Sequence, residues 1–225
     1  MPAYAKPTRQ ATSAVRVPGR PSGGTMPLST PTPIRYRMVV ALSRADWVES
    51  GLISLRSAGF DAIAVEPLAK SLGATKGSFY WHFADRAELV AAVLELWEQR
   101  ETTDVIARVS AIADPRERLQ ALGSAAYAHA ATGTTLATLL AHGDDPRVTE
   151  VLRRVTRTRL AFLENLYAEC DSDHPQLRGR LAYALYLGMA LLRASDPAGD
   201  PPEEDREPFF ALALDLMWPG MTTNS

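Results

Sequence analysis

From about residue 43 onward, apolar residues recur along this chain at intervals of three and four positions, the spacing of amphipathic helices. In the first such stretch Val48, Leu52 and Leu55 fall on one face, after the capping sequence S-R-A-D at 43–46. The helix is expected to stop near Gly59, because glycine readily adopts the left-handed turn that ends helices. No stretch alternates with the period of two that is typical of strands. The pattern predicts an all-α protein of about nine helices.

The remaining helices follow from the same pattern. A second short helix is predicted over 65–72, where Pro67 is tolerated because it lies in the first turn. A tight turn at 73–74 precedes a third short helix over residues 75–83, T-K-G-S-F-Y-W-H-F, called here the aromatic segment. The capping sequence D-R-A-E at 85–88 opens a long helix that reaches about residue 110. Further helices are expected at about 115–131, 134–142, 146–166, 175–194 and 206–218.

The N-terminal part of the chain does not share this pattern. Residues 1–33 contain seven prolines and three glycines, too little apolar surface to offset the entropy of ordering, so we expect disorder. Residues 1–42 carry a charge of +6 with no acid, whereas 43–100 carry −2 and the remainder −6. The basic end would favour a polyanion. Met26 and Met38 leave open whether this tail is an arm or a start-site artefact.

Composition narrows the kinds of functional site that the chain can contain. The single cysteine, Cys170, excludes an intramolecular disulfide and a Cys-rich zinc site, and a reducing cytoplasm is the expected compartment. The longest apolar stretch, 181–192, is too short to span a bilayer. His129, His142 and His174 have spacings that match no metal-ligand motif. Because residues 95–225 also lack nucleotide-binding and hydrolase motifs, we expect no metal, no cofactor and no enzymatic activity.

The aromatic segment divides into two faces when it is placed on a helical wheel. Phe79 and Phe83, four residues apart, share the face expected to meet the core. Lysine, serine and tyrosine side chains, an imidazole and backbone N–H groups at a helix start all donate hydrogen bonds to phosphate. A Trp edge can meet a thymine methyl in the major groove. The groups expected to face away from the core are Lys76, Gly77, Ser78, Tyr80, Trp81 and His82.

Two short helices joined by a glycine turn form a helix-turn-helix, and here the sequence resembles a known family. Residues 59–90 are similar to the DNA-binding domain of the TetR/AcrR family of bacterial transcriptional regulators. That family's pattern is G-[FY]…V-x-x-[IL]-A…L-G-[VA]-[ST]-x-G-[ST]-[LF]-Y-x-[HY]-F-x-x-[KR]-x-x-L. The matching residues are Gly59, Phe60, Val65, Leu68, Ala69, Gly73, Thr75, Gly77, Ser78, Phe79, Tyr80, His82, Phe83, Arg86 and Leu89.

The resemblance implies roles for individual residues. Base-edge contacts are implied for Lys76, Gly77 and Trp81, although Trp81 could instead pack along the edge of the long helix. Arg86 takes the phosphate-anchoring position at the start of that helix. The family usually has a capping Thr before the second helix, where this chain has Ala64, and a lost cap costs about 1 kcal/mol. Phosphate contacts are implied for Thr75, Lys76, Ser78, Tyr80 and His82.

The resemblance also implies a domain plan. The tail at 1–37 is followed by the helix-turn-helix domain at 38–84 and by an effector-binding and dimerisation domain at 85–225. The effector pocket would take a small, largely apolar molecule. Arg153, Arg154, Arg157 and Arg159 are interpreted as a solvated helix face. The candidate pocket residues are the aromatic side chains at core-type positions, Trp97, Tyr127, Phe162 and Tyr167.

The last two long helices are expected to pair two copies of the chain. A two-fold contact would set two aromatic segments about 34–36 Å apart, one turn of DNA, and so predicts a near-palindromic operator. Ala184 and Gly188 would allow close approach of two backbones. The candidate interface residues are Leu177, Leu181, Leu185, Gly188, Leu192, Phe209, Phe210 and Leu216.

The function expected from these features is a homodimeric, ligand-responsive repressor that binds double-stranded operator DNA and no membrane. Two alternatives stay open. One is an all-helical enzyme acting on an apolar small molecule in residues 95–225. The other is a DNA-binding or adaptor protein without an effector, for which the basic tail would matter more. The sequence leaves open the effector, the operator bases and the sign of regulation.

Overall fold

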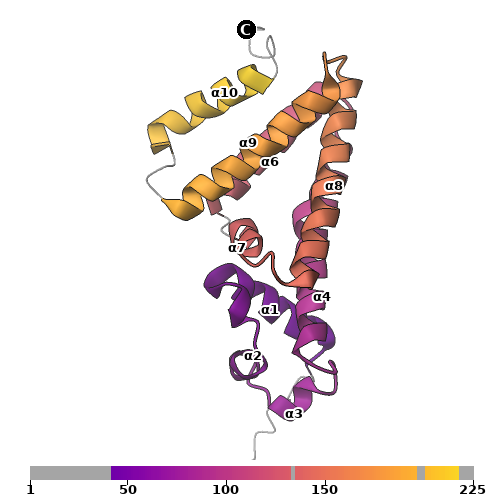
Figure 1. The fold of residues 1–225 in the computed structure, drawn as a ribbon, viewed down its shortest axis with the longest axis vertical. Helices are drawn as coiled ribbons and strands as arrows, with labels where there is room; N and C mark the ends of the chain where they lie inside the picture. The colour runs from indigo at the N-terminus through magenta and orange to yellow at the C-terminus, as the bar shows by residue number, and fades with distance from the viewer. Residues whose placement is uncertain (1–41, 133–134, 197–200, 218–225) are drawn as a thin grey trace, which may run out of the picture. The chain divides into compact units, whose positions relative to one another are not determined.

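The computed structural model describes residues 42–132, 135–196 and 201–217; within these ranges the side chains of 128–132, 210, 214, 216 and 217 are not described. Every regular element of these ranges is helical, so the predicted all-α class is confirmed (Figure 1). The expected tail at 1–37 lies outside the described residues. The side chains of Phe210 and Leu216, two of the candidate interface residues, lie outside them as well.

The helix bounds agree with the sequence pattern to within a few residues in most of the chain. Short 3-10 turns at Phe60–Ala62 and Glu203–Asp205 join some of the helices. The helices are α1 (Arg44–Ala58), α2 (Val65–Ser71), α3 (Lys76–Phe79), α4 (Arg86–Glu98), α5 (Asp104–Ser110), α6 (Pro115–Thr132), α7 (Thr135–Ala141), α8 (Pro146–Glu169), α9 (Pro175–Ser195) and α10 (Arg206–Met217).

The long helix predicted from 85 to 110 is continuous, but a π-helical turn at Gln99–Thr103 separates α4 from α5. Two hydrogen bonds from α8 stabilise this wide turn. Arg159 Nη2 donates to the Glu101 carbonyl at 2.8 Å, and Arg159 Nε donates to the Thr102 hydroxyl at 3.0 Å. Single π turns are often found at functional sites. The sequence pattern did not reveal this one, and the side chain that bonds it lies more than fifty positions away.

Helix starts follow the local sequence closely. Ser43 and Asp46 form the predicted capping box, which lowers the pKa of Asp46 through the Ser43 backbone N–H. At α4 the Asp85 carboxylate accepts from the Glu88 N–H at 2.9 Å, while the Glu88 carboxylate accepts from the Ala84 N–H at 2.8 Å. Ala64 makes no side-chain cap at α2, as the sequence predicted.

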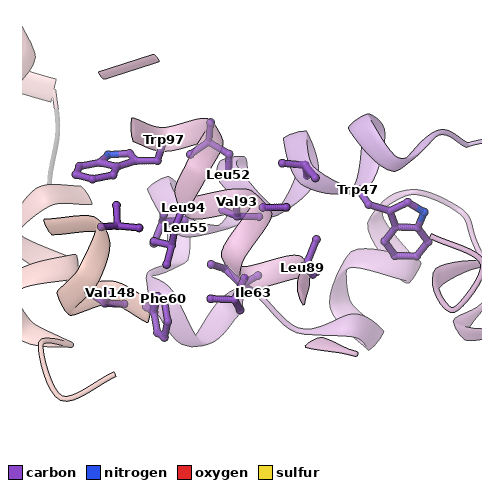
Figure 2. Close-up of a cluster of buried hydrophobic side chains, with 14 of the residues drawn as sticks. Trp47, Leu52, Leu55, Phe60, Ile63, Leu89, Val93, Leu94, Trp97 and Val148 are labelled. Atoms are coloured by element: carbon purple, nitrogen blue, oxygen red, sulfur yellow. The ribbon is translucent and has the colours of Figure 1, made fainter. Parts of the chain in front are cut away.

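The larger core lies between α1 and α4 and includes residues of the helix-turn-helix, α7 and α8. Gly51 brings α1 close to α4, because a Cβ at this position would lie 2.5 Å from Val93 Cγ2. Figure 2 shows Val148 of α8 near Phe60, in the cluster to which α1 contributes Leu52 and Leu55. One hydrophobic core therefore joins the helix-turn-helix to the start of α8.

A second, smaller core forms between α6 and α8, where Leu119, Leu166, Tyr167 and Cys170 are buried. Burial raises the pKa of Tyr167 to about 12 and also raises the pKa of the Cys170 thiol. Helices α8 and α9 contact each other and converge where α8 ends and α9 begins (Figure 1). They approach closely at Gly179, where a Cβ would lie 3.0 Å from the Glu164 backbone nitrogen.

The cap of α8 yields a pH-dependent prediction. Asp145 accepts from Arg147 Nε at 3.0 Å and from the Arg147 backbone N–H at 2.9 Å, and its pKa is lowered to about 2, chiefly by the Arg147 side chain. A lowered pKa means that the carboxylate stabilises the fold above about pH 4, and that this contribution disappears as the pH falls through about 2. We expect Asp145→Asn, which keeps a capping oxygen, to lower the free energy of unfolding at neutral pH.

The difference between wild type and Asp145→Asn should shrink as the pH falls from about 4 to about 2. Urea denaturation at a series of pH values measures it. A difference that stays constant across this range would contradict the assignment.

Candidate nucleic-acid interface

The aromatic segment forms a shorter helix than its pattern suggested. Thr75 caps α3 by accepting from the Ser78 N–H at 3.2 Å, and the helix ends at Phe79 with Tyr80 as its C-cap. The predicted helix over 75–83 is therefore wrong in length. After Phe79 the chain makes one further turn, in which the His82 N–H donates to the Phe79 carbonyl at 2.9 Å. The chain then has to extend, because the cap of α4 at Asp85 requires extended backbone, with φ −156° and ψ 179°.

Phe79 anchors this segment to the core. Its ring is fully buried and meets Trp47 of α1 edge to face, with 5.4 Å between ring centroids. It also stacks on Phe83 at 5.2 Å, and the Arg44 guanidinium lies 4.6 Å from the centroid of the Phe83 ring. Such aromatic pairs contribute about 0.5–1.5 kcal/mol beyond the area that they bury. The prediction that Phe79 and Phe83 face the core is confirmed.

The same anchoring leaves the neighbouring side chains in solvent. Trp81 is 87% exposed and Tyr80 is 61% exposed. The alternative in which Trp81 packs along the long helix is therefore wrong for this structure. Lys76 is exposed at the start of α3, where its ammonium forms an ion pair with Glu66 of α2. A large exposed aromatic side chain beside a lysine is a surface suited to a partner.

The other predicted contact residues flank this exposed pair. Thr75 and Gly77 are exposed, while Ser78 and His82 are half-buried. A Cβ at Gly77 would meet only Thr75 Oγ1, at 3.6 Å, so packing within the chain does not require a glycine there. Arg86 is half-buried, and its Nε donates to the Ile63 carbonyl at 2.6 Å. This bond, which the sequence did not predict, ties the start of α4 to the segment before α2.

A second feature is a cavity of about 640 Å³ bounded by α5, α6, α8, α9, α10 and the π turn. Three of the four candidate pocket residues line it, namely Tyr127, Phe162 and Tyr167. Trp97 does not line it: this side chain is 1% exposed and belongs to the larger core, so its placement in the pocket is wrong. Leu185 and Phe209, expected at the interface between two copies, also line the cavity.

Sequence reasoning missed the charged residues of this cavity. Arg159 lies in its wall and is half-buried, whereas the pattern had placed it on a solvated face. The available signal was its spacing. Arg159 follows Val155 by four positions and precedes Phe162 by three, so it occupies a position of the apolar stripe of α8. The other charged wall residues are Arg56, Arg100, Glu101, Asp104 and Arg108.

Part of this chain is similar in sequence to known regulatory proteins. Residues 50–93 match the model of the family described as bacterial regulatory proteins, tetR family. The probable HTH-type transcriptional regulator ArpR of Pseudomonas putida is 34% identical over 77 residues, which are 34% of this chain and 36% of that regulator. The match thus spans little more than a third of this curated relative.

Solved structures share the fold over most of the chain. The reduced form of E. coli NemR is 20% identical, covers 75% of this chain and 93% of its own, and has a TM-score of 0.64. AibR in complex with isovaleryl coenzyme A and operator DNA is 19% identical, covers 78% of this chain and 98% of its own, and has a TM-score of 0.57. At these identities the likeness establishes the fold alone.

The described residues contain neither a candidate membrane span nor a candidate metal site. None of the helices there combines the length and the apolar character needed to cross a membrane. No group of three or more His, Cys, Asp or Glu side chains in these ranges is arranged to hold a metal ion.

Two neighbouring aromatic residues test the geometry. Phe79→Ala should lower the free energy of unfolding by about 3–5 kcal/mol, because it removes a fully buried ring from between Trp47 and Phe83. Trp81→Ala, two positions along, should change it by no more than about 0.5 kcal/mol, because that side chain is exposed. Urea denaturation followed by circular dichroism measures both. Equal costs for the two variants would show that the segment is oriented differently.

Proposed function

Because this chain belongs to the TetR/AcrR family of bacterial transcriptional regulators, we propose that it binds operator DNA as a homodimer and that a small molecule in the cavity controls this binding. The observation that carries the proposal is that Tyr80 and Trp81 are exposed beside Lys76, while Phe79, which lies between them and Lys76 in the sequence, is fully buried. On one surface these side chains supply hydrogen-bond donors for DNA phosphates and an apolar edge for a base.

Gly77 supports the same assignment. The space around it is open in the isolated chain, so the missing side chain serves close approach by something outside the chain. The Thr75 hydroxyl accepts from the Ser78 N–H and keeps its hydrogen to donate to a phosphate, whereas the Ser78 hydroxyl donates to the Thr75 carbonyl and would have to turn its hydrogen to reach one. We assign phosphate contacts to Thr75, Lys76, Ser78, Tyr80 and His82, and base-edge contacts to Lys76, Gly77 and Trp81.

Arg86 has a different part from the one the resemblance implied. Its Nε is already committed to the Ile63 carbonyl, so only its terminal nitrogens are available to a phosphate. In this proposal Arg86 chiefly fixes the entry to α2 relative to the start of α4.

Electrostatics make the individual basic residues important. The stretch from 43 to 100 carries a net charge of −2, so it provides little general attraction for DNA. Glu66 also competes with phosphate for the ammonium of Lys76. Affinity should therefore depend strongly on a few well-placed contacts.

This competition gives two predictions of opposite sign. Lys76→Ala should weaken binding about tenfold on every sequence and reduce the salt slope by about 1, because a phosphate contact is lost. Glu66→Gln should strengthen binding by up to about fivefold, because it releases Lys76 from an exposed ion pair. Fluorescence anisotropy at several salt concentrations, with a duplex selected from a random pool, measures both.

Arg157→Ala is the matched control, since it removes an exposed positive charge from α8. It should leave affinity and salt slope unchanged. If Lys76→Ala behaves like this control, the DNA-binding surface has been assigned to the wrong residues. Failure of the selection to enrich any duplex would contradict sequence-specific binding itself.

The exposed apolar face of α9 supports dimerisation. Leu177, Leu181 and Leu192 are each at least 60% exposed, and a Cβ at Gly188 would meet nothing within 4 Å. A stripe of this kind in water is favourable only if another surface covers it. We assign its cover to a second copy of the chain, in a two-fold contact that would also set two aromatic segments on one DNA duplex.

Introducing a charge into this stripe should separate the two copies. We expect Leu181→Glu to convert a dimer into a 24.5 kDa monomer at micromolar concentration, because a dimer would have to bury an unpaired carboxylate. Size-exclusion chromatography with light scattering measures the mass. Gln120→Glu, which introduces the same charge on an exposed position of α6, should stay dimeric. A dimer that survives Leu181→Glu would place the interface elsewhere.

Ligand control follows from the position of the cavity. AibR, which shares this fold, was crystallised with both a ligand and operator DNA, which supports assigning the two to one chain here. The cavity wall includes the π turn that continues α4, and α4 packs on α1 of the helix-turn-helix. A ligand that binds one arrangement of this turn more tightly than the other shifts the protein toward that arrangement. DNA affinity then falls by at most the ratio of the ligand's affinities for the two arrangements, and a protein that loses DNA in this way would be a repressor.

The enzyme alternative lacks support of this kind. The matching relatives are described as transcriptional regulators. We propose domain limits of 38–84 for DNA binding and 85–225 for effector binding and dimerisation, although one core joins α1, α4 and α8 across this division.

A further inference from the structure

Arg159 is a half-buried charged side chain of the cavity wall that forms no ion pair with any carboxylate of the described residues. Arg159 donates from Nε to the Thr102 hydroxyl and from Nη2 to the Glu101 carbonyl, both neutral acceptors. Its Nη1 is buried and meets no hydrogen-bond acceptor. The guanidinium also lies 5.5 Å from the centroid of the Tyr186 ring. In the part of the chain that the structure describes, no carboxylate forms an ion pair with Arg159.

The neighbouring acids do not supply the missing charge. The Glu101 carboxylate forms an ion pair with Arg56, and Arg100 is paired with Glu49. The Asp104 carboxylate accepts from the Gln99 side chain at 2.7 Å. Burial raises the pKa of Tyr186, with Arg159 acting in the opposite direction, so this phenol stays neutral at physiological pH. The wall carries Arg56, Arg100, Arg108 and Arg159 against Glu101 and Asp104, and Glu49 balances Arg100, so an excess of one positive charge remains in a wall where Arg159 has no ion pair.

A half-buried cation without a counter-ion carries part of the cost of desolvation, and an anion that arrives with its own apolar surface removes that cost. We propose that the cavity binds an amphipathic organic monoanion, a carboxylate on an apolar body, whose carboxylate is held at the Arg159 guanidinium. This refines the largely apolar effector expected from the sequence, and it rests on the proposed role of the cavity as the effector site.

The charge and the shape of the wall narrow the ligand class. One guanidinium with two of its nitrogens already bonded balances a single negative charge. A phosphate, with a charge nearer −2, would leave charge uncompensated in an apolar cavity. Tyr127, Phe162 and Tyr167 provide aromatic surface for the apolar body. A volume of about 640 Å³ falls within the range for small-molecule sites.

A charge series tests this inference on the full-length protein. Isothermal titration calorimetry would compare hexanoate, decanoate and tetradecanoate with the alcohols and the primary amines of the same chain lengths. We expect at least one carboxylate to bind about tenfold or more tightly than its alcohol, and the protonated amine to bind most weakly. Equal binding of carboxylate and alcohol, or no binding of any carboxylate, would overturn the proposal.

Variants of α8 assign the preference to a residue. Arg159→Gln should reduce the preference for carboxylate over alcohol to less than about threefold, whereas Arg159→Lys, which keeps the charge, should retain much of it. Arg157→Gln removes an exposed charge from the same helix and should leave the preference unchanged. Because Arg159 also bonds the π turn, thermal melting checks the fold of each variant. A folded Arg159→Gln protein with an intact preference would overturn the proposal.

A separate measurement keeps this inference distinct from the proposed regulation. DNA binding is followed by anisotropy with and without the carboxylate. If the carboxylate binds through Arg159 and leaves DNA affinity unchanged, the ligand assignment stands and the regulatory role of the cavity fails. If the carboxylate releases DNA equally from wild type and Arg159→Gln, the regulatory role stands and the assignment to Arg159 fails.

Discussion

The burial of Phe79 is the contact on which the proposed DNA-binding surface depends. Its ring fills the space between Trp47 of α1 and Phe83, so the short α3 can take only one rotation about its axis. That rotation exposes Tyr80 and Trp81. A four-residue helix has almost no stability of its own, since helix nucleation is unfavourable. The orientation of the surface is therefore a consequence of aromatic packing and of the caps on either side, and does not come from helix propensity.

The cavity and the helix-turn-helix are connected through the backbone of one continuous helix. Arg159 reaches from α8 to the π turn between α4 and α5, where it bonds a backbone carbonyl and a buried threonine hydroxyl. An arginine that bonds the backbone and also lines the proposed ligand site would have two competing partners. A ligand carboxylate that draws the guanidinium away would therefore act directly on the helix that packs against α1.

Several local features were predictable because short-range chemistry determines them. The cap at Ser43 and the inward face of Phe79 were identified from residues within four positions of each other, and the missing cap at Ala64 from the family resemblance. The errors have a common origin. Trp97 was assigned to the pocket because aromatic side chains line cavities and cores alike, and its neighbours were unknown. Arg159 was assigned to solvent because charge normally outweighs stripe position, and the acceptors that hold it lie on a different helix.

The sequence by itself determined the helical class, most helix limits, the family of the helix-turn-helix and which residues of the aromatic segment face inward. Each of these depends on periodicity, capping or a motif of fixed spacing, all of which act over a few residues. Only the tertiary structure decided the length of α3, the π turn, the ion pair between Lys76 and Glu66, and the cavity wall around Arg159. These features depend on distances between helices, which are set by how close-packed side chains fill the core, and no local pattern encodes them.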